Sequence, residues 1–160
     1  MRSFWRIYES LTNSVAVLLF AAMIVVTSLG VFFRYVLNSP LHWTEESDRY
    51  LFIWLTWVGA SITMRYKAHI AVDVLVRYLD PRMKLWFALA TQISILVFLG
   101  LLVNASLPVL EVAGRTRTAA TDIPTNWVYM SVPVGCTLIA IETLRIMADT
   151  WRSMRGEVRA

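Results

Sequence analysis

The chain has 160 residues, of which 58% are hydrophobic, whereas soluble domains are about 45–50% apolar. The formal net charge is +4, but most basic residues flank apolar runs, which indicates membrane topology and not nucleic-acid binding. A single cysteine, Cys136, excludes a disulfide framework and a cysteine-based metal site. We therefore expect one membrane domain over residues 1–160 and no nucleic-acid partner.

The first apolar run, residues 15–33, carries no charge and is long enough for a helical span. Arg2 and Arg6 precede it, as in the charged region of a signal peptide. The apolar stretch is too long for a signal peptide, however, and no small-residue cleavage site clearly follows it. We therefore place a first transmembrane helix over residues 13–36.

The second run, residues 50–64, has 15 residues, which is roughly 22 Å of helix at 1.5 Å per residue. A hydrocarbon core of ~30 Å needs more than this. A helix that begins near Thr44, a residue suited to an N-cap, supplies the missing turns. We therefore place a second span over residues 44–65, with its charged first turns at the interface or inside the protein.

The segment between the second and third spans has the pattern of a helix that lies in the membrane interface. His69 and Asp73 share one helical face with other charged residues, and apolar residues gather on another. One histidine and one aspartate make a weak metal site, because the only other histidine, His42, is expected on the opposite side of the membrane. We expect an amphipathic interfacial segment and no bound metal.

The third run, residues 85–110, follows the dipeptide Asp80-Pro81. Aspartate suits a helix N-cap, and proline suits the first helical turn. We place the third span over residues 82–110.

The fourth run begins at Trp127, and Pro124 suits its first turns. Pro133 and Gly135 lie inside the run and predict a kink. We place the fourth span over residues 124–149. Charges at spacings of three and four predict that its end is solvated and stabilised by ion pairs between Glu142, Arg145, Asp149 and Arg152.

Four spans place both termini on one side of the membrane, and the basic residues indicate which side. Eleven of the fifteen basic residues belong to the termini and the middle loop. The other four, Arg34, Arg49, Arg115 and Arg117, belong to the two remaining loops. The positive-inside rule therefore predicts cytoplasmic N- and C-termini.

The second span carries the main candidates for an interface with another subunit. Thr56 with Ala60, and Gly59 with Thr63, are pairs of small residues that let helices approach closely in lipid. Glu45 lies above them, four residues before Arg49, at the spacing of an ion pair. Two interpretations stay open: an acidic helix end that meets another subunit, or a capped helix start among the head groups. The interface candidates are Glu45, Glu46, Arg49, Thr56, Gly59, Ala60 and Thr63.

Residues for catalysis or for a cofactor are not apparent in the sequence. It has no nucleophile with a base partner, no glycine-rich phosphate loop and no histidine pair for haem. We expect a protein that is no enzyme and binds no cofactor. Two alternatives are a small membrane enzyme or haem protein, and a small transporter that works alone.

The stretch 33–75 resembles the small membrane subunit of tripartite ATP-independent periplasmic (TRAP) transporters, the DctQ-like family. A Trp-x-Glu-Glu motif and a His-Ile-x-Val-Asp motif occur in it in the order and at the spacing of the family. Tyr66-Lys67 departs from the pattern, since the family suggests an acidic residue and glycine there. The positions that match the family's motifs include Arg34, Trp43, His69, Asp73, Pro124, Pro133 and Gly135.

The resemblance implies an all-α integral membrane protein of the bacterial inner membrane. It implies two partners besides the lipid bilayer: a large (M-type) membrane subunit and a periplasmic substrate-binding protein. In such a system an ion gradient, usually of sodium, drives uptake of an organic acid. The small subunit is expected to act as a scaffold for the large one.

Overall fold

A computed structural model describes residues 2–66 and 81–157 of the chain. Within these residues all regular structure is helical except one isolated β-bridge between Arg117 and Pro124. The predicted interfacial segment, with His69 and Asp73, lies outside the described residues. The helices are α1 (Arg2–Tyr35), α2 (His42–Arg65), α4 (Pro81–Ala113), the short α5 (Asn126–Tyr129) and α6 (Ser131–Glu157).

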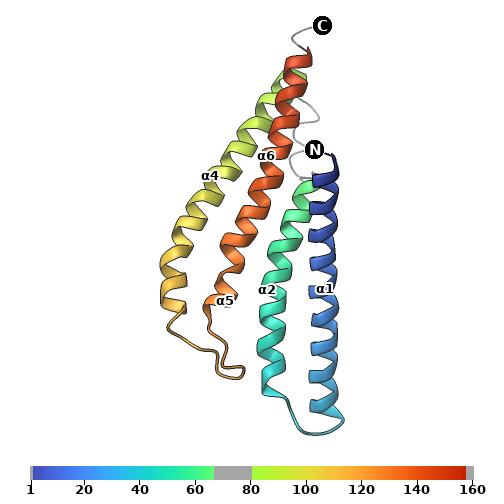
Figure 1. The fold of residues 1–160 in the computed structure, drawn as a ribbon, viewed down its shortest axis with the longest axis vertical. Helices are drawn as coiled ribbons and strands as arrows, with labels where there is room; N and C mark the ends of the chain where they lie inside the picture. The colour runs from blue at the N-terminus through green and yellow to red at the C-terminus, as the bar shows by residue number, and fades with distance from the viewer. Residues whose placement is uncertain (1, 67–80, 158–160) are drawn as a thin grey trace.

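The four long helices stand side by side in a single row (Figure 1). The order across the row is α4, α6, α2 and α1, so α2 packs against both α1 and α6, and α6 also packs against α4. α1 is antiparallel to α2, and α4 is antiparallel to α6, whereas the neighbours α2 and α6 run in the same direction; both termini lie at one end of the row (Figure 1). We call this the terminal end; the opposite end, with the α1–α2 and α4–α5 connections, is the loop end.

A row one helix thick leaves most apolar side chains uncovered. None of the residues in the most apolar stretch of α1 is buried, and in α6, which packs on two neighbours, the corresponding share is 33%. Three helical stretches are long and apolar enough to cross a bilayer: Trp5–Tyr35, Met83–Ala113 and Asn126–Arg152. These exposed apolar helices are those of a multi-pass membrane protein. Charged and hydroxyl-bearing residues make α2 less apolar, so its role as a fourth span stays a prediction.

Two glycines bring the helices of the row close together. A Cβ atom on Gly30 would lie 2.9 Å from the Thr44 hydroxyl oxygen, and one on Gly135 would lie 2.6 Å from the Trp57 ring. Larger side chains would therefore separate α1 from α2, and α2 from α6. Thr44 is not the N-cap that the sequence predicts: α2 begins two residues earlier, and the Thr44 hydroxyl donates to the Leu41 carbonyl at 2.7 Å.

The predicted kink in the last span is instead a break at Met130, between α5 and α6. Pro133 explains its position, because a proline ring collides with the carbonyl four residues earlier, here that of Tyr129. Pro124 was predicted in the first turns of this span, but it precedes α5 and pairs with Arg117 in the isolated bridge. In α4, Pro81 is the first helical residue, as predicted.

Candidate functional site

A polar group around the fully buried Glu142 lies at the terminal end. The Arg65 guanidinium donates from Nε to Glu142 Oε1 at 2.8 Å and from Nη2 to the Thr12 hydroxyl at 2.7 Å. Its Nη1 donates to Asn13 Oδ1 at 3.3 Å. Arg65 closes α2, whereas Thr12 and Asn13 belong to α1 and Glu142 to α6. One side chain therefore joins three helices.

A second arginine completes this group. Arg145 of α6 forms an ion pair with Glu9 of α1, and its Nη1 lies 3.9 Å from Glu142 Oε2. Its guanidinium also lies over the Trp5 ring, 4.6 Å from the centroid, within the range of a cation–π contact. The group, which we call the Arg65 cluster, comprises Glu9, Thr12, Asn13, Arg65, Glu142 and Arg145.

At Glu142 the structure corrects the prediction that the end of α6 is solvated, although the predicted Glu142–Arg145 pair is present at 3.9 Å. The Glu142 side chain is fully buried, and that of Arg65 is only 10% exposed. Further along the predicted charge ladder, Arg152 lies 3.7 Å from Asp149 in an exposed pair, as predicted. The prediction fails at Glu142 because this residue faces α2, where the Arg65 charge compensates it.

The Arg65–Glu142 pair was not predicted from the sequence, because the two residues are 77 positions apart. In the sequence alone, Arg65 indicates only topology, and Glu142 belongs to a local ladder of charges. One indication was present: Glu142 directly follows an apolar run, and charges at membrane depth usually face protein or water.

A second polar group lies at the loop end and involves one of the predicted interface residues. Glu46 Oε2 accepts hydrogen bonds from the Ala120 and Thr121 amides at 3.1 and 2.8 Å, and from the Thr121 hydroxyl at 2.9 Å. Glu46 therefore ties the start of α2 to the α4–α5 connection. Its neighbour Trp43 is partly exposed at the same end.

The predicted Glu45–Arg49 ion pair is absent from the described residues. Glu45 instead accepts a hydrogen bond from Arg34 of α1 at 2.9 Å, and Arg34 is one of the family-motif positions. Asp48, on another face, accepts a hydrogen bond from the Thr27 hydroxyl at 3.0 Å. The acids of α2 thus reach across to neighbouring segments, and a local pairing rule does not anticipate this.

The small residues of α2 point away from the rest of the chain. Thr56, Ala60 and Thr63 are exposed, and a Cβ atom on Gly59 would meet nothing within 4 Å. The Thr56 and Thr63 hydroxyls donate to carbonyls of their own helix at 2.7 and 3.0 Å. The face of α2 that packs inside the chain is the neighbouring one, which carries Trp57 and the fully buried Ser61. We call the exposed set, Thr56, Gly59, Ala60 and Thr63, the small-residue face.

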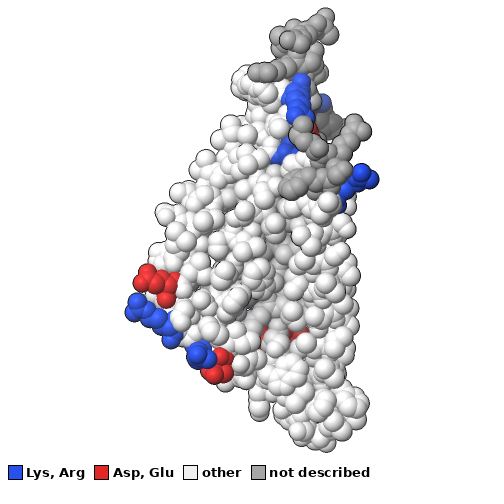
Figure 2. Space-filling view, in the orientation of Figure 1, with Lys and Arg blue, Asp and Glu red and all other residues white. Residues whose placement is uncertain are grey.

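Charged residues outside these groups are mostly exposed. Arg115 lies 3.5 Å from Glu111, and Arg117 lies 3.3 Å from Asp122, at the end of α4 and in the α4–α5 connection. Figure 2 shows basic and acidic side chains gathered at this end of the molecule. Among the residues that the structure describes, no three His, Cys, Asp or Glu side chains gather as metal ligands would. In the described part of the chain, the polar groups therefore join helices and connections to one another.

Fold and polar contacts together define a multi-pass helical membrane protein whose charges join its helices and whose apolar faces are left open. The family described as tripartite ATP-independent periplasmic transporters, DctQ component, matches residues 23–156. The chain belongs to this family, and the resemblance drawn from its motifs is confirmed. The family consists of transporter subunits and is not an enzyme family.

Relatives over most of the chain carry matching descriptions. A Haemophilus influenzae protein described as a TRAP transporter small permease protein is 29% identical over 160 residues, which is 99% of each chain. The C4-dicarboxylate TRAP transporter small permease protein DctQ of Vibrio cholerae is 25% identical over 94% of this chain and 74% of its own length. The chain is thus similar to small permease subunits along nearly its whole length.

One relative is much longer than this chain. The sialic acid TRAP transporter permease protein SiaT of Haemophilus influenzae is 24% identical over 89% of this chain, but the match covers only 23% of SiaT. A segment similar to this chain therefore forms part of a larger permease polypeptide.

Proposed function

We propose that this small permease subunit is a scaffold for a large membrane subunit of its transporter. The observation that carries the proposal is the SiaT match, in which a segment like this chain is covalently continuous with a much longer permease. Two proteins that occur as one polypeptide in a relative are expected to contact each other when they are separate.

The surface of the chain supports the same proposal. The small-residue face has no partner within the described residues, and Gly59 leaves open space for the backbone of another helix. We propose that this face, together with the exposed ends of Glu45 and Arg49, contacts the large subunit. Head groups around a capped helix are the alternative, and a substitution that blocks the face distinguishes the two.

We further propose that all four long helices cross the bacterial inner membrane, with the termini in the cytoplasm. α2 lies between α1 and α6 in the row (Figure 1), so it is expected to occupy the same depth as its two apolar neighbours. The excess of basic residues in the termini and the middle loop favours the cytoplasm for the terminal end.

The complete transporter is proposed to take up an organic acid that a periplasmic binding protein delivers, driven by an ion gradient such as that of sodium. The names of two relatives specify a C4-dicarboxylate and sialic acid, both of which are acids. We expect the substrate of this transporter to be of the same chemical class and to be selected by the other two subunits.

Reconstitution tests the proposal. The tagged chain is purified from its own host together with the proteins that remain bound, and proteoliposomes are prepared with the chain alone and with the complex. With the binding protein and its acid present, an inward sodium gradient should drive uptake only into vesicles that contain the complex. Uptake by the chain alone would favour a small transporter that works by itself. If no large membrane protein co-purifies, the scaffold proposal is wrong.

A further inference from the structure

Arg49 of α2 carries a charge that the described part of the chain leaves without an ion-pair partner. Its side chain is exposed, and Glu45, one helical turn earlier, pairs with Arg34 at 2.9 Å and not with Arg49. An arginine stays charged in proteins, and its guanidinium has five N–H donors and no acceptor. Arg49 therefore requires acceptors that these residues do not supply.

The position of Arg49 along α2 places it at membrane depth. The carboxylate of the preceding residue, Asp48, accepts the Thr27 hydroxyl at 3.0 Å, so this turn of α2 is level with Thr27 of α1. Thr27 lies within the uncharged run 15–33, six residues before its end, which is roughly 9 Å of helix. Beyond Thr27, toward the loop end, α1 still exposes apolar side chains such as Phe32. At such depth charged side chains face protein or water, because contact with lipid tails is costly.

Arg49 begins a line of outward-facing positions along α2. Successive members are three, four, three and four residues apart, which is the 3.5-residue repeat of a left-handed coiled coil. Membrane helices that pack on such a repeat cross at about +20°. Phe52 is 60% exposed, and a Cβ atom on Gly59 would meet nothing within 4 Å. We call this line the α2 seam; its members are Arg49, Phe52, Thr56, Gly59 and Thr63.

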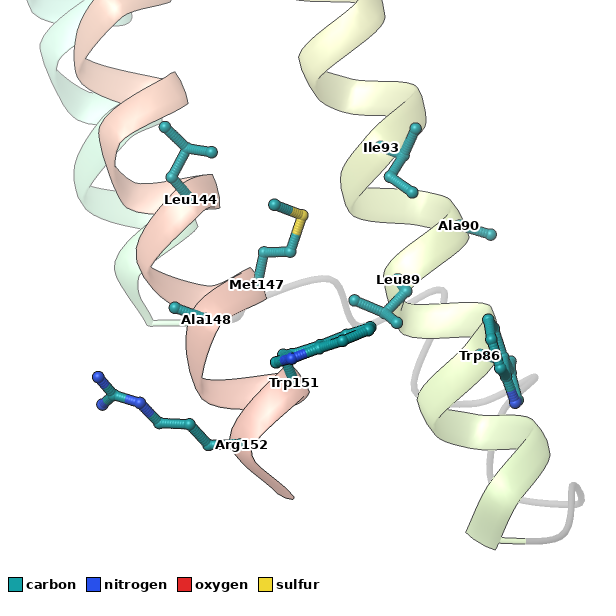
Figure 3. A pocket seen from close by; sticks show the side chains of 9 residues that line it. All are labelled: Trp86, Leu89, Ala90, Ile93, Leu144, Met147, Ala148, Trp151 and Arg152. Carbon is teal, nitrogen blue, oxygen red and sulfur yellow. The ribbon is translucent and has the colours of Figure 1, made fainter. Parts of the chain in front are cut away.

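The charge distinguishes the α2 seam from the apolar groove between α4 and α6. That groove is lined by apolar side chains such as Leu89 and Met147, and the Arg152 side chain points away from it (Figure 3). Arg152 also has a nearby carboxylate, on Asp149 at 3.7 Å. The groove therefore gives no chemical indication of its occupant, whereas the α2 seam carries a cation that specifies an anionic one.

We propose that a transmembrane helix of the large subunit packs along the α2 seam and places a carboxylate, from an Asp or Glu, against Arg49. The inference rests on the proposed scaffold function, and it adds the chemistry by which the partner is recognised. A carboxylate on a packed helix can meet Arg49 from the side, at its own depth, and can accept two of its N–H groups at once. A lipid phosphate in the head-group layer would lie past Glu45, whose exposed carboxylate repels it.

Co-purification with charge variants tests the pairing. The complex is purified from its own host through a tag on this chain, and the large subunit is measured as a molar ratio to the chain. Arg49→Lys keeps the charge and should retain most of this ratio. Arg49→Glu opposes two carboxylates and should lower the ratio at least about tenfold. Arg115→Glu is the matched control, since Arg115 is exposed and lies far from the α2 seam, after α4, and should leave the ratio unchanged.

A charge exchange then identifies the partner residue. Each Asp and Glu in the spans of the large subunit is changed to Lys in turn and combined with Arg49→Glu. One exchange should restore the ratio, because the attraction returns with its signs reversed. Unchanged retention by a folded Arg49→Glu chain, or a loss that no exchange restores, would overturn the inference.

Two further results are distinguished from these. If Arg49→Glu does not fold, as judged by its helical circular dichroism, Arg49→Gln decides, because it removes the charge without reversing it and should also lower the ratio. Absence of the large subunit from the wild-type preparation would contradict the scaffold proposal, and this inference with it. Normal retention by the wild type and by Arg49→Gln alike would contradict the pairing alone.

Discussion

At the residue scale, the Arg65–Glu142 pair is expected to dominate the stability of the helix row. Glu142→Gln removes the charge that compensates Arg65, whose side chain is only 10% exposed. Breaking a buried ion pair from one side costs about 3–5 kcal/mol, because the remaining charge stays buried without its partner. We therefore expect a clearly lower melting temperature for the purified chain in detergent, measured by circular dichroism.

Glu111→Gln is the matched control for this experiment, because Glu111 forms an exposed pair with Arg115 at 3.5 Å. Exposed pairs contribute roughly 0–1 kcal/mol, so the melting temperature should hardly change. Equal effects of the two substitutions would contradict a special role for the Arg65 cluster.

Substitution of Glu46 is expected to affect only the α4–α5 connection at the loop end. Its carboxylate accepts both the Ala120 and the Thr121 amides, so Glu46→Ala should release the α4–α5 connection without separating the helices. Trypsin should then cleave faster after Arg115 and Arg117, as followed by mass spectrometry of the fragments. Glu45→Ala removes a neighbouring carboxylate that binds Arg34 and not the connection. Faster cleavage in both variants would show that Glu46 does not act through these hydrogen bonds.

At the element scale, three glycines allow one substitution to be compared in three environments. Gly59→Leu should leave the isolated chain folded, because a Cβ atom there meets nothing within 4 Å, but it should reduce co-purification with the large subunit. Gly100→Leu, on α4 with equally open surroundings, should affect neither. Gly135→Leu should destabilise the isolated chain, because its Cβ would lie 2.6 Å from Trp57. If Gly59→Leu behaves like Gly100→Leu, the small-residue face contacts lipid.

The elements themselves were largely predictable, since apolar runs and prolines mark them in the sequence. The helix that begins at Pro81 and the disruption caused by Pro133 follow from local rules. The partners of the charged residues were not predictable. The spacing of Glu45 suggested Arg49, but the structure pairs it with Arg34. Which face of a helix packs against its neighbours depends on contacts between distant segments, and no periodicity within one helix specifies them.

Asp48 illustrates the same limit. From the sequence it lies on a face apart from the interface candidates and is a natural control position for them. In the structure its carboxylate accepts the Thr27 hydroxyl between α2 and α1. Asp48→Ala is therefore expected to disturb the α1–α2 contact, and Gly100→Leu is the better control for an interface experiment.

At the scale of the whole molecule, the position of both termini at one end of the row makes a prediction about topology (Figure 1). Reporter fusions at Ala160 and at Thr118 should report opposite sides of the membrane, with Ala160 in the cytoplasm. The physical reason is the excess of basic residues in the termini and the middle loop. A periplasmic reporter at Ala160 would reverse the proposed orientation, and reporters on the same side would contradict the arrangement of the helices.

A row of helices one layer thick is expected to bend easily, because neighbouring helices can rotate about the contact between them. The Arg65 cluster and the hydrogen bonds of Glu46 are expected to oppose this bending. At the terminal end, Arg65 fastens α2 to α1 and α6, and at the loop end Glu46 fastens α2 to the α4–α5 connection. Both polar groups involve α2 and lie at its opposite ends. We therefore expect them to hinder sliding of the helices along one another. We therefore expect the row to behave as a stiff layer with two broad faces, one of which can pack against the proposed large subunit without being distorted.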